Sequence, residues 1–337
     1  MKNLDLNKDI ILPEGKIPSR LLKKLLLIVE NTNKNKNILI GPSIGEDGAV
    51  VTGFSKLVIS TDPITLAGKN QGFYAVSVTC NDIVAMGGHP LYFTTSILIP
   101  KGTLFSEVKE LFKNIASAAE KSNIAWISGH TEVTNTVKKP IVVGTAVGEL
   151  KGPIWSSSGA CPGDDVIMTK WVAIEGSAIL SQEHPKAKAI LGKKFNEVTN
   201  WIHNPGISLL QESIILREFP INSAHDPTEG GIAQGLHEIA ACSNVRIEVY
   251  KESLPIKPST QTLCSALNIN PLGLLSSGVL IITVSPSVTK KVIIELTKGG
   301  ITGTLIGKVL KGSGVVIREK YSVTEMPRFD SDEINRI

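Results

Sequence analysis

An apolar helix that carries a carboxylate constrains the fold of this chain more than any other feature. Residues 70–86 have helical spacing, and Gly87–Gly88 ends the pattern. The apolar stripe of this helix consists of Val76, Cys80, Ile83 and Val84. Asp82 lies among these residues, and a buried carboxylate is costly unless it is paired or binds a metal. The sequence therefore predicts a buried helix in which Asp82 has partners from other parts of the chain.

The first half of the chain has the pattern of an α+β domain. Amphipathic spacing predicts helices over 18–30, 70–86 and 103–122. Stretches rich in β-forming residues predict strands within 49–62 and over 91–99, 123–129 and 140–150. This order, α-β-β-α-β-α-β-β, is typical of a sheet with helices on one face.

The second half begins after a segment, residues 151–165, with the Gly, Ser and Pro density of a linker and turn. A strand from Asp165 is followed by helical patterns over 174–217 and 228–242, and by strand–helix–strand patterns up to 318. We therefore expect an N-terminal domain at 1–152, a C-terminal α/β domain at 153–320 and a polar surface tail at 321–337.

Composition excludes several classes of protein. The chain has 337 residues, 42% hydrophobic and 20% charged, with a net charge of +4, as expected for two globular domains without a dedicated nucleic-acid surface. Its four cysteines are far apart, which argues against a cysteine zinc site or a disulfide framework. The polar N-terminus and the absence of an apolar run near ~20 residues predict a cytoplasmic protein without a membrane span.

Polar residues that follow apolar segments are the candidates for chemistry. Besides Asp82 these are Asp47 in IGEDGAVV, Asp62 in LVISTDP and His130 in ISGHTEV. Side chains at strand ends and loops converge on one edge of a sheet, and converging carboxylates need a hard cation such as Mg²⁺ between them. Mg²⁺ held by carboxylates usually accompanies substrate phosphates. The structural alternatives are turns at 46–48 and at Asp62–Pro63, and a satisfied loop histidine at His130.

Other nucleotide and hydrolase motifs are missing from the sequence. There is no G-x-x-x-x-G-K-[ST], no G-x-G-x-x-G that opens a βαβ unit, and no G-x-S-x-G. Phosphates would therefore be held through a metal and backbone amides.

Seven short motifs follow one another along the chain. They are LPEGKIP (12–18), GEDGAVV (45–51), STDP (60–63), NDIVAMGGHPLY (81–92), SGHTEV (128–133), HDPTEGG (225–231) and PLGLLSSG (271–278). Each motif is weak alone, but together the seven resemble the superfamily of aminoimidazole ribonucleotide (AIR) synthase, also called PurM-like. LPEGKIP, NDIVAMGGHPLY and DPTEGG are more similar to its HypE-like branch, which acts in hydrogenase maturation, than to its kinases or cyclases.

The resemblance implies a two-domain α+β fold, an N-terminal domain that dimerises through its sheet, and ATP with Mg²⁺ in the cleft between the domains. The metal ligands that it implies are Asp47, Asp62 and Asp82. Further nucleotide-binding positions are Asn81, Gly45 and Lys16, with a solvated lysine as the alternative for Lys16. The catalytic positions are Asp226, Thr228 and His130, although Thr228 could instead cap the following helix.

The implied reaction is ATP-dependent phosphoryl transfer that activates an amide- or carbonyl-type oxygen, in a small molecule or in a protein-bound amide, with a maturation protein as partner. The sequence departs from the HypE pattern at two positions. HypE carries its substrate on a C-terminal cysteine, whereas the last cysteine here is Cys264, and His130 stands where the branch commonly has aspartate. The alternatives are a kinase or cyclase of the thiamine-monophosphate kinase or AIR synthase type, and a non-catalytic ATP-binding assembly factor.

Overall fold

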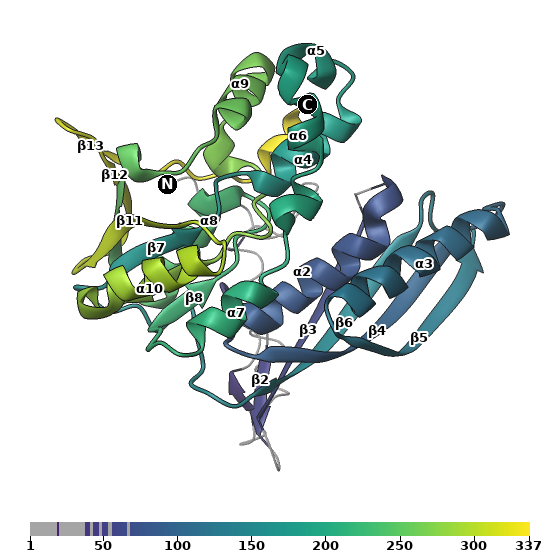
Figure 1. The fold of residues 1–337 in the computed structure, drawn as a ribbon, viewed down its shortest axis with the longest axis horizontal. Helices are drawn as coiled ribbons and strands as arrows, with labels where there is room; N and C mark the ends of the chain where they lie inside the picture. Colours follow the sequence, from purple (N-terminus) through teal and green to yellow (C-terminus); the bar gives the residue numbers. More distant parts are fainter. Residues whose placement is uncertain (1–18, 20–37, 41–42, 47–48, 53–55, 66–67) are drawn as a thin grey trace, which may run out of the picture.

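Two β-sheets organise the chain, as the computed structural model shows for residues 19, 38–40, 43–46, 49–52, 56–65 and 68–337 (Figure 1). The first sheet has the strand order β1-β2-β3-β6-β4-β5. Its strands are β1 Ile38–Ile40, β2 Ala49–Thr52, β3 Lys56–Ile64, β4 His89–Pro100, β5 Ala125–Thr134 and β6 Ile141–Leu150. Neighbouring strands are antiparallel except β4 and β5, which are parallel.

Helices α2 (Gln71–Ala85) and α3 (Phe105–Lys121) cover one face of this sheet (Figure 1). Alternation along the strands explains the asymmetry, because Val58 and Ser60 of β3 are buried while Ile59 between them is exposed. The predicted helices at 70–86 and 103–122 and the predicted strands of this domain are confirmed. The predicted helix at 18–30 falls almost entirely outside the described residues.

The second sheet has the order β13-β12-β9-β11-β7-β10-β8 and is antiparallel except where β12 meets β9. Its strands are β7 Asp165–Thr169, β8 Ser223–His225, β9 Arg246–Tyr250, β10 Ile281–Val284, β11 Gly303–Leu310, β12 Gly314–Arg318 and β13 Val323–Glu325. The longer helices are α4 Ile174–Glu183, α8 Gly231–Cys242, α9 Pro258–Leu267 and α10 Pro286–Lys298.

The helical pattern predicted over 174–217 is divided into short helices. After α4 come α5 Ala187–Leu191, α6 Phe195–Thr199 and α7 Leu210–Leu216, with the short helical turns Gly192–Lys194 and Ile202–Gly206 between them. Two of the breaks contain Pro185 and Pro205. Proline interrupts a helix because it lacks the N–H that an α-helix interior requires. Gly192 forms a third break with a φ of 50°.

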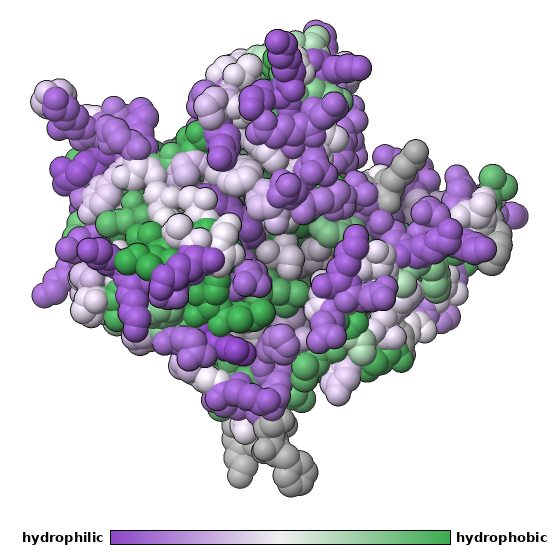
Figure 2. Space-filling view, viewed as in Figure 1, coloured by the Kyte–Doolittle hydropathy of each residue, from purple (hydrophilic) through white to green (hydrophobic). Residues whose placement is uncertain are grey.

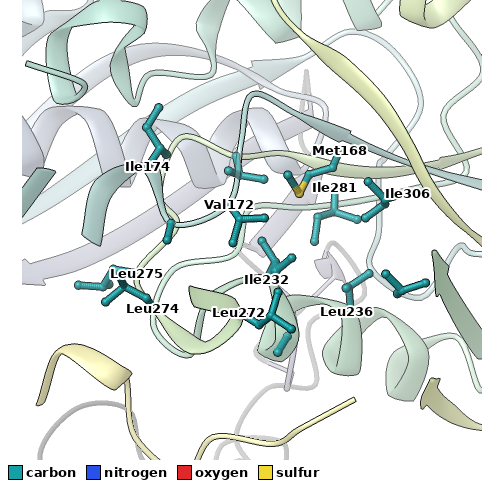
Figure 3. Close-up of a cluster of buried hydrophobic side chains, with 14 of the residues drawn as sticks. Met168, Val172, Ile174, Ile232, Leu236, Leu272, Leu274, Leu275, Ile281 and Ile306 are labelled. Atoms are coloured by element: carbon teal, nitrogen blue, oxygen red, sulfur yellow. The ribbon is translucent and has the colours of Figure 1, made fainter. Parts of the chain in front are cut away.

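A hydrophobic core holds the second domain together. Figure 3 shows side chains from β7, α8, β10 and β11 meeting those of the segment before α4 and of the loop at 272–275. Fully burying a side chain of this kind contributes about 1.5–3 kcal/mol. The starts of α4 and α8 are therefore fixed in the domain by the same core.

Helix α2 lies between the two domains, which explains its apolar composition. It packs on β3, β6 and α3 of its own domain and contacts α7 and β8 of the other. Val84 and Ala85 at its C-terminal end join a cluster with Trp155, Leu280 and Ile282 of the second domain.

Asn81 fastens α2 to the second domain through both ends of its carboxamide. Its Nδ2 donates a hydrogen bond to the Ile207 carbonyl at 2.8 Å, and its Oδ1 accepts one from the Leu209 amide at 2.9 Å. Asn81 is buried, so these bonds are shielded from water. One of the two polar residues in the middle of the predicted helix therefore has a structural explanation.

The expectation of a polar surface tail at 321–337 is corrected by the structure. Strand β13 pairs with β12, and Met326 is buried. The Asp332 Oδ2 atom accepts a hydrogen bond from the Gly230 amide at 2.8 Å, and the Glu333 Oε2 atom accepts one from the Asn270 amide at 2.7 Å. The segment is polar because its carboxylates satisfy backbone amides of the domain. None of the helices in the described part of the chain has the length and apolar character needed to cross a bilayer.

Candidate functional site between the domains

A cavity of about 680 Å³ opens between the two domains. We call it the interdomain cleft. Its N-terminal wall comes from β3, α2 and the loop before β2, and its C-terminal wall from α4, the loop before α8 and the loop at 275–277. The lining residues are Glu46, Ser60, Thr61, Asp62, Pro63, Ile64, Thr65, Tyr74, Val78, Asp82, Glu175, Ile179, Thr228, Glu229, Leu275 and Ser277.

Two of the predicted metal ligands lie on the N-terminal wall. Ser60 and Asp62 are two residues apart in β3 and so point to the same face of the sheet, toward α2. The Ser60 hydroxyl donates a hydrogen bond to Asp82 Oδ2 on α2. The structure thus brings Asp62 and Asp82 to one wall of the cleft and gives Asp82 a polar partner.

Thr228 and Glu229 approach from the C-terminal wall. The Thr228 hydroxyl donates to Glu229 Oε2 at 2.9 Å, and both residues line the cleft. The alternative that Thr228 caps the next helix does not describe α8, whose N-cap is Gly230 at a φ of 77°, with no side-chain capping bond. Thr228 serves that helix through its main chain, since its carbonyl accepts from the Gly231 amide at 3.1 Å.

Glu175 is a further carboxylate of this wall, on the first turn of α4. Its Oε2 accepts a hydrogen bond from the Ser277 amide at 3.2 Å. Burial raises the pKa of Glu175 to about 7, against the lowering effect of the Ser277 bond, and the charges of Glu229 and Asp332 raise it further. Burial likewise raises the pKa of Asp332, to about 6.

The charge of the cleft has one sign. Acidic residues from both domains line it, namely Glu46, Asp62, Asp82, Glu175 and Glu229, while its described lining contains no lysine, arginine or histidine. An anionic ligand such as a polyphosphate would be repelled here unless cations entered with it.

The donor atoms fit Mg²⁺ bound together with phosphates. The available groups are carboxylate and hydroxyl oxygens, which are the ligands that this hard cation prefers. Within the described parts of the chain no group of three His, Cys, Asp or Glu residues could hold a metal ion by itself. Mg²⁺ usually takes one or two carboxylates and completes its shell with water and phosphate oxygens, and Asp62 and Asp82 supply two carboxylates on one wall of the cleft.

The remaining predicted residues have other surroundings. Gly45 packs on α8, where an added Cβ would lie 2.7 Å from Cys242 Sγ, and its carbonyl accepts a hydrogen bond from the Ser157 hydroxyl at 2.5 Å. Asp226 is buried beside the cleft but does not line it. Asp47 and Lys16 lie outside the described residues.

His130 is not brought to the cleft. It lies on β5 at the far edge of the first sheet, where its Nε2 is 3.6 Å from Glu132 Oε2 and both side chains are largely exposed. A catalytic role for His130 in this cleft has no support from its position.

Sequence reasoning missed several residues of the cleft. Glu46 and Ser60 could have been found from the sequence, since they are close to the predicted ligands Asp47 and Asp62. No sequence pattern pointed to Tyr74 or Glu175, because each lies in a helix beside apolar residues. Each reaches the cleft only through the docking of the domains.

The fold and the cleft together define the class of this protein, which is a two-domain α+β protein with an acidic cleft between its domains. The family described as AIR synthase related protein, N-terminal domain, matches residues 45–150, and the one described as AIR synthase related protein, C-terminal domain, matches residues 161–320. The chain belongs to these AIR synthase-related, PurM-like proteins and is HypE-like.

Two relatives show where in the family it falls. Over 278 residues the chain is 28% identical to a provisionally named hydrogenase expression/formation protein of Methanocaldococcus jannaschii, covering 80% of each chain. Over 239 residues it is 30% identical to the carbamoyl dehydratase HypE of Bradyrhizobium diazoefficiens, covering 68% of this chain and 67% of the relative.

Solved structures share the fold. The HypE–HypF complex contains a chain with a TM-score of 0.72 at 23% identity, covering 90% of this chain and 99% of that one. The hydrogenase maturation protein HypE in complex with ATP gives a TM-score of 0.68 at 22% identity, covering 96% of this chain and 98% of that one.

Proposed function

We propose that this protein is an ATP- and Mg²⁺-dependent enzyme of the HypE-like branch. It transfers the γ-phosphoryl group of ATP to an amide- or carbonyl-type oxygen of its substrate, within hydrogenase metal-centre maturation. The observation that carries the proposal is the cleft itself, where carboxylates from both domains converge without a cationic side chain among the described lining residues. Named relatives in hydrogenase maturation and an ATP-bound relative of the same fold support it.

The electrostatics of the cleft explain why a metal is part of the proposal. Asp62 and Asp82 would hold Mg²⁺ on the N-terminal wall, with Asp47 as a third proposed ligand. When bound, Mg²⁺ neutralises the charge of the phosphates and orients them for in-line transfer. Ser60 fixes the Asp82 carboxylate, so that this ligand is oriented before the nucleotide arrives.

The C-terminal wall would present the acceptor to the phosphates. Thr228 and Glu229 lie across the cleft from Asp62 and Asp82, each domain supplying one wall. We assign Thr228 the role of orienting the acceptor or the γ-phosphate, with its hydroxyl aligned by Glu229 at 2.9 Å. Phosphoryl transfer depends mainly on such positioning and charge neutralisation, so two rigid walls of opposite origin suit it.

A homodimer and a maturation partner belong to the same proposal. The face of the first sheet away from α2 and α3 carries exposed apolar side chains, among them Ile59, Tyr92 and Ile127. In Figure 2 hydrophobic surface is visible along the lower margin of this domain. We propose that a second copy covers this face. The complex of the relative HypE with HypF supports a maturation protein as a further partner.

Calorimetry with the full chain tests the nucleotide site. ATP is titrated with Mg²⁺ and again with EDTA, into the wild type and into Asp47→Asn, Asp62→Asn and Asp82→Asn. Partners that merely support metal ligands are worth about 10–100-fold in affinity, so losing a ligand should weaken Mg²⁺–ATP binding at least about tenfold. Asp330→Asn is the matched control, because Asp330 is exposed and outside the cleft.

The outcomes separate the candidate functions. No binding by the wild type, or equal binding by all variants, would refute the site. Binding without ADP formation for any amide, carbonyl or phosphate acceptor would favour the non-catalytic assembly factor, and turnover of thiamine monophosphate would favour the kinase.

A further inference from the structure

The carboxylate of Asp332, in the C-terminal segment, lies buried against two loops of the C-terminal wall of the cleft. Its Oδ2 atom accepts a hydrogen bond from the Gly230 amide at 2.8 Å, and its Oδ1 atom accepts one from the Ile334 amide at 2.8 Å. The Leu275 amide donates to the same carboxylate. Asp332 is 3% exposed, so these bonds are shielded from water. One side chain therefore joins the C-terminal segment to the loop before α8 and to the 275–277 loop.

The two loops that Asp332 joins carry part of the cleft lining. The loop before α8 supplies Thr228 and Glu229, and the other loop supplies Ser277. The loops also touch each other, because the Ser276 amide donates to the Thr228 carbonyl at 3.4 Å. A shift of either loop would therefore move lining side chains on both.

Helix α8 begins without a side-chain cap from its own residues. Its N-cap is Gly230, which has no side chain and has a φ of 77°. Asp332 accepts from the amide of this N-cap residue, as the glutamate of a capping box does, although it lies 102 positions away in the chain. Its negative charge also lies at the positive end of the helix dipole. The direction of the loop before α8 thus depends on the C-terminal segment.

The charge of Asp332 is directed at backbone amides. Burial raises the pKa of Asp332 to about 6, against the lowering effect of the bonds from three backbone amides, and the charge of Glu229 raises it further. The nearby Arg336 pairs with Glu333 instead, at 2.9 Å. Above pH 7 Asp332 is therefore ionised, and hydrogen bonds to an ionised acceptor are stronger than neutral ones.

Glu333 provides an internal comparison. It is also 3% exposed, and its Oε2 atom accepts a hydrogen bond from the Asn270 amide at 2.7 Å. Asn270 is not among the residues that line the cleft. The two adjacent carboxylates thus fasten the same segment to the same domain, but Asp332 is the one bonded to the loops of the cleft wall.

We propose that Asp332 is a positioning residue of the interdomain cleft, which holds Thr228 and Ser277 in place opposite Asp62 and Asp82. This inference rests on the proposed function and adds the C-terminal segment to the residues on which γ-phosphoryl transfer depends. Asp332 acts through the two loops and lies outside the cleft lining. Group transfer is sensitive to such positioning, since a displacement of about 1 Å can lower the rate about 100-fold.

Steady-state ADP formation by the full chain tests this role, with Mg²⁺–ATP as substrate, water as the acceptor and a pH of 8. The variants are Asp332→Asn and, as the matched control, Glu333→Gln. Each keeps the shape of the side chain and replaces one acceptor oxygen by an NH₂ group. Calorimetry gives the affinity for Mg²⁺–ATP, thermal unfolding gives the stability, and hydrogen exchange reports on the two loops. Asp332→Ser, which retains one acceptor oxygen, replaces Asp332→Asn if that variant does not fold.

Asp332→Asn should lower kcat about 10–100-fold, as expected for a loss of positioning. The affinity for Mg²⁺–ATP should change less than about threefold, because the proposed metal ligands lie on the opposite wall. Backbone amides at 228–231 and 275–277 should exchange faster in this variant. Glu333→Gln should lose a similar amount of thermal stability and keep the wild-type kcat.

A folded Asp332→Asn protein with the wild-type kcat would overturn the inference. An equal loss of kcat in Glu333→Gln would also overturn it, because the effect would then come from docking of the whole segment. A wild type that binds Mg²⁺–ATP but forms no ADP would do the same, while leaving the nucleotide site of the proposed function intact. A wild type that binds no Mg²⁺–ATP would refute the proposed function, and this inference with it.

Discussion

Replacing Asn81 by alanine should uncouple the two domains. The substitution removes the partners of two buried backbone groups, the Ile207 carbonyl and the Leu209 amide, which bond to Asn81 at 2.8 and 2.9 Å. Both residues are fully buried, so water cannot readily replace the lost partners. Each unsatisfied group costs about 1–3 kcal/mol, and the two together should cost about 2–6 kcal/mol. The loss falls on the contact between α2 and the segment before α7.

Urea unfolding followed by far-UV circular dichroism and tryptophan fluorescence measures this loss. The wild-type domains should unfold together, whereas in Asn81→Ala the two signals should separate as the weakened contact opens first. Asn114→Ala is the matched control. Its Oδ1 accepts from the Phe73 amide at 2.7 Å within one domain, so that variant should lose only about 1 kcal/mol and keep coincident transitions.

The same variant distinguishes a structural Asn81 from the nucleotide-binding Asn81 implied by the family resemblance. With both ends of its carboxamide bonded to backbone, Asn81 should affect ATP affinity only as far as the domains separate. A stable, fully coupled Asn81→Ala protein that loses less than about 1 kcal/mol, but binds ATP much more weakly, would refute this reasoning.

Two further predictions concern the cleft and the open sheet. The pKa of Glu175 is about 7 when folded and about 4.3 in an unfolded chain, so the contribution of this group to stability is fully present below about pH 4.3 and is lost as pH rises to about 7, by at most about 4 kcal/mol. Glu175→Gln should remove this decline, and its midpoint urea concentration at pH 8 should exceed that of the wild type; a lower value at pH 8 would contradict the prediction. Tyr92→Arg on the exposed sheet face should shift the mass measured by light scattering from dimer to monomer while leaving circular dichroism unchanged, and a wild type that is monomeric at high concentration would exclude this interface.

Much of the fold could be predicted from the sequence because periodicity is a local property. Helices α2 and α3 and strands β3 and β6 lie where the spacing of apolar residues predicted them. The family could be predicted for a similar reason, since its motifs are short and follow the chain in order. Asp82 stood out because a carboxylate in an apolar helix conflicts with its neighbours, and this conflict can be seen within a few residues.

Only the tertiary structure decided which polar residues share a site. Asn81 and Asp82 are adjacent on α2, yet one bonds to the backbone of the second domain and the other lines the cleft. Tyr74 and Glu175 are distant in the chain and reach the same cavity because the sheets dock across α2. Apolar spacing specifies that a helix is buried, whereas the partners of its polar side chains depend on contacts between segments that no local pattern encodes.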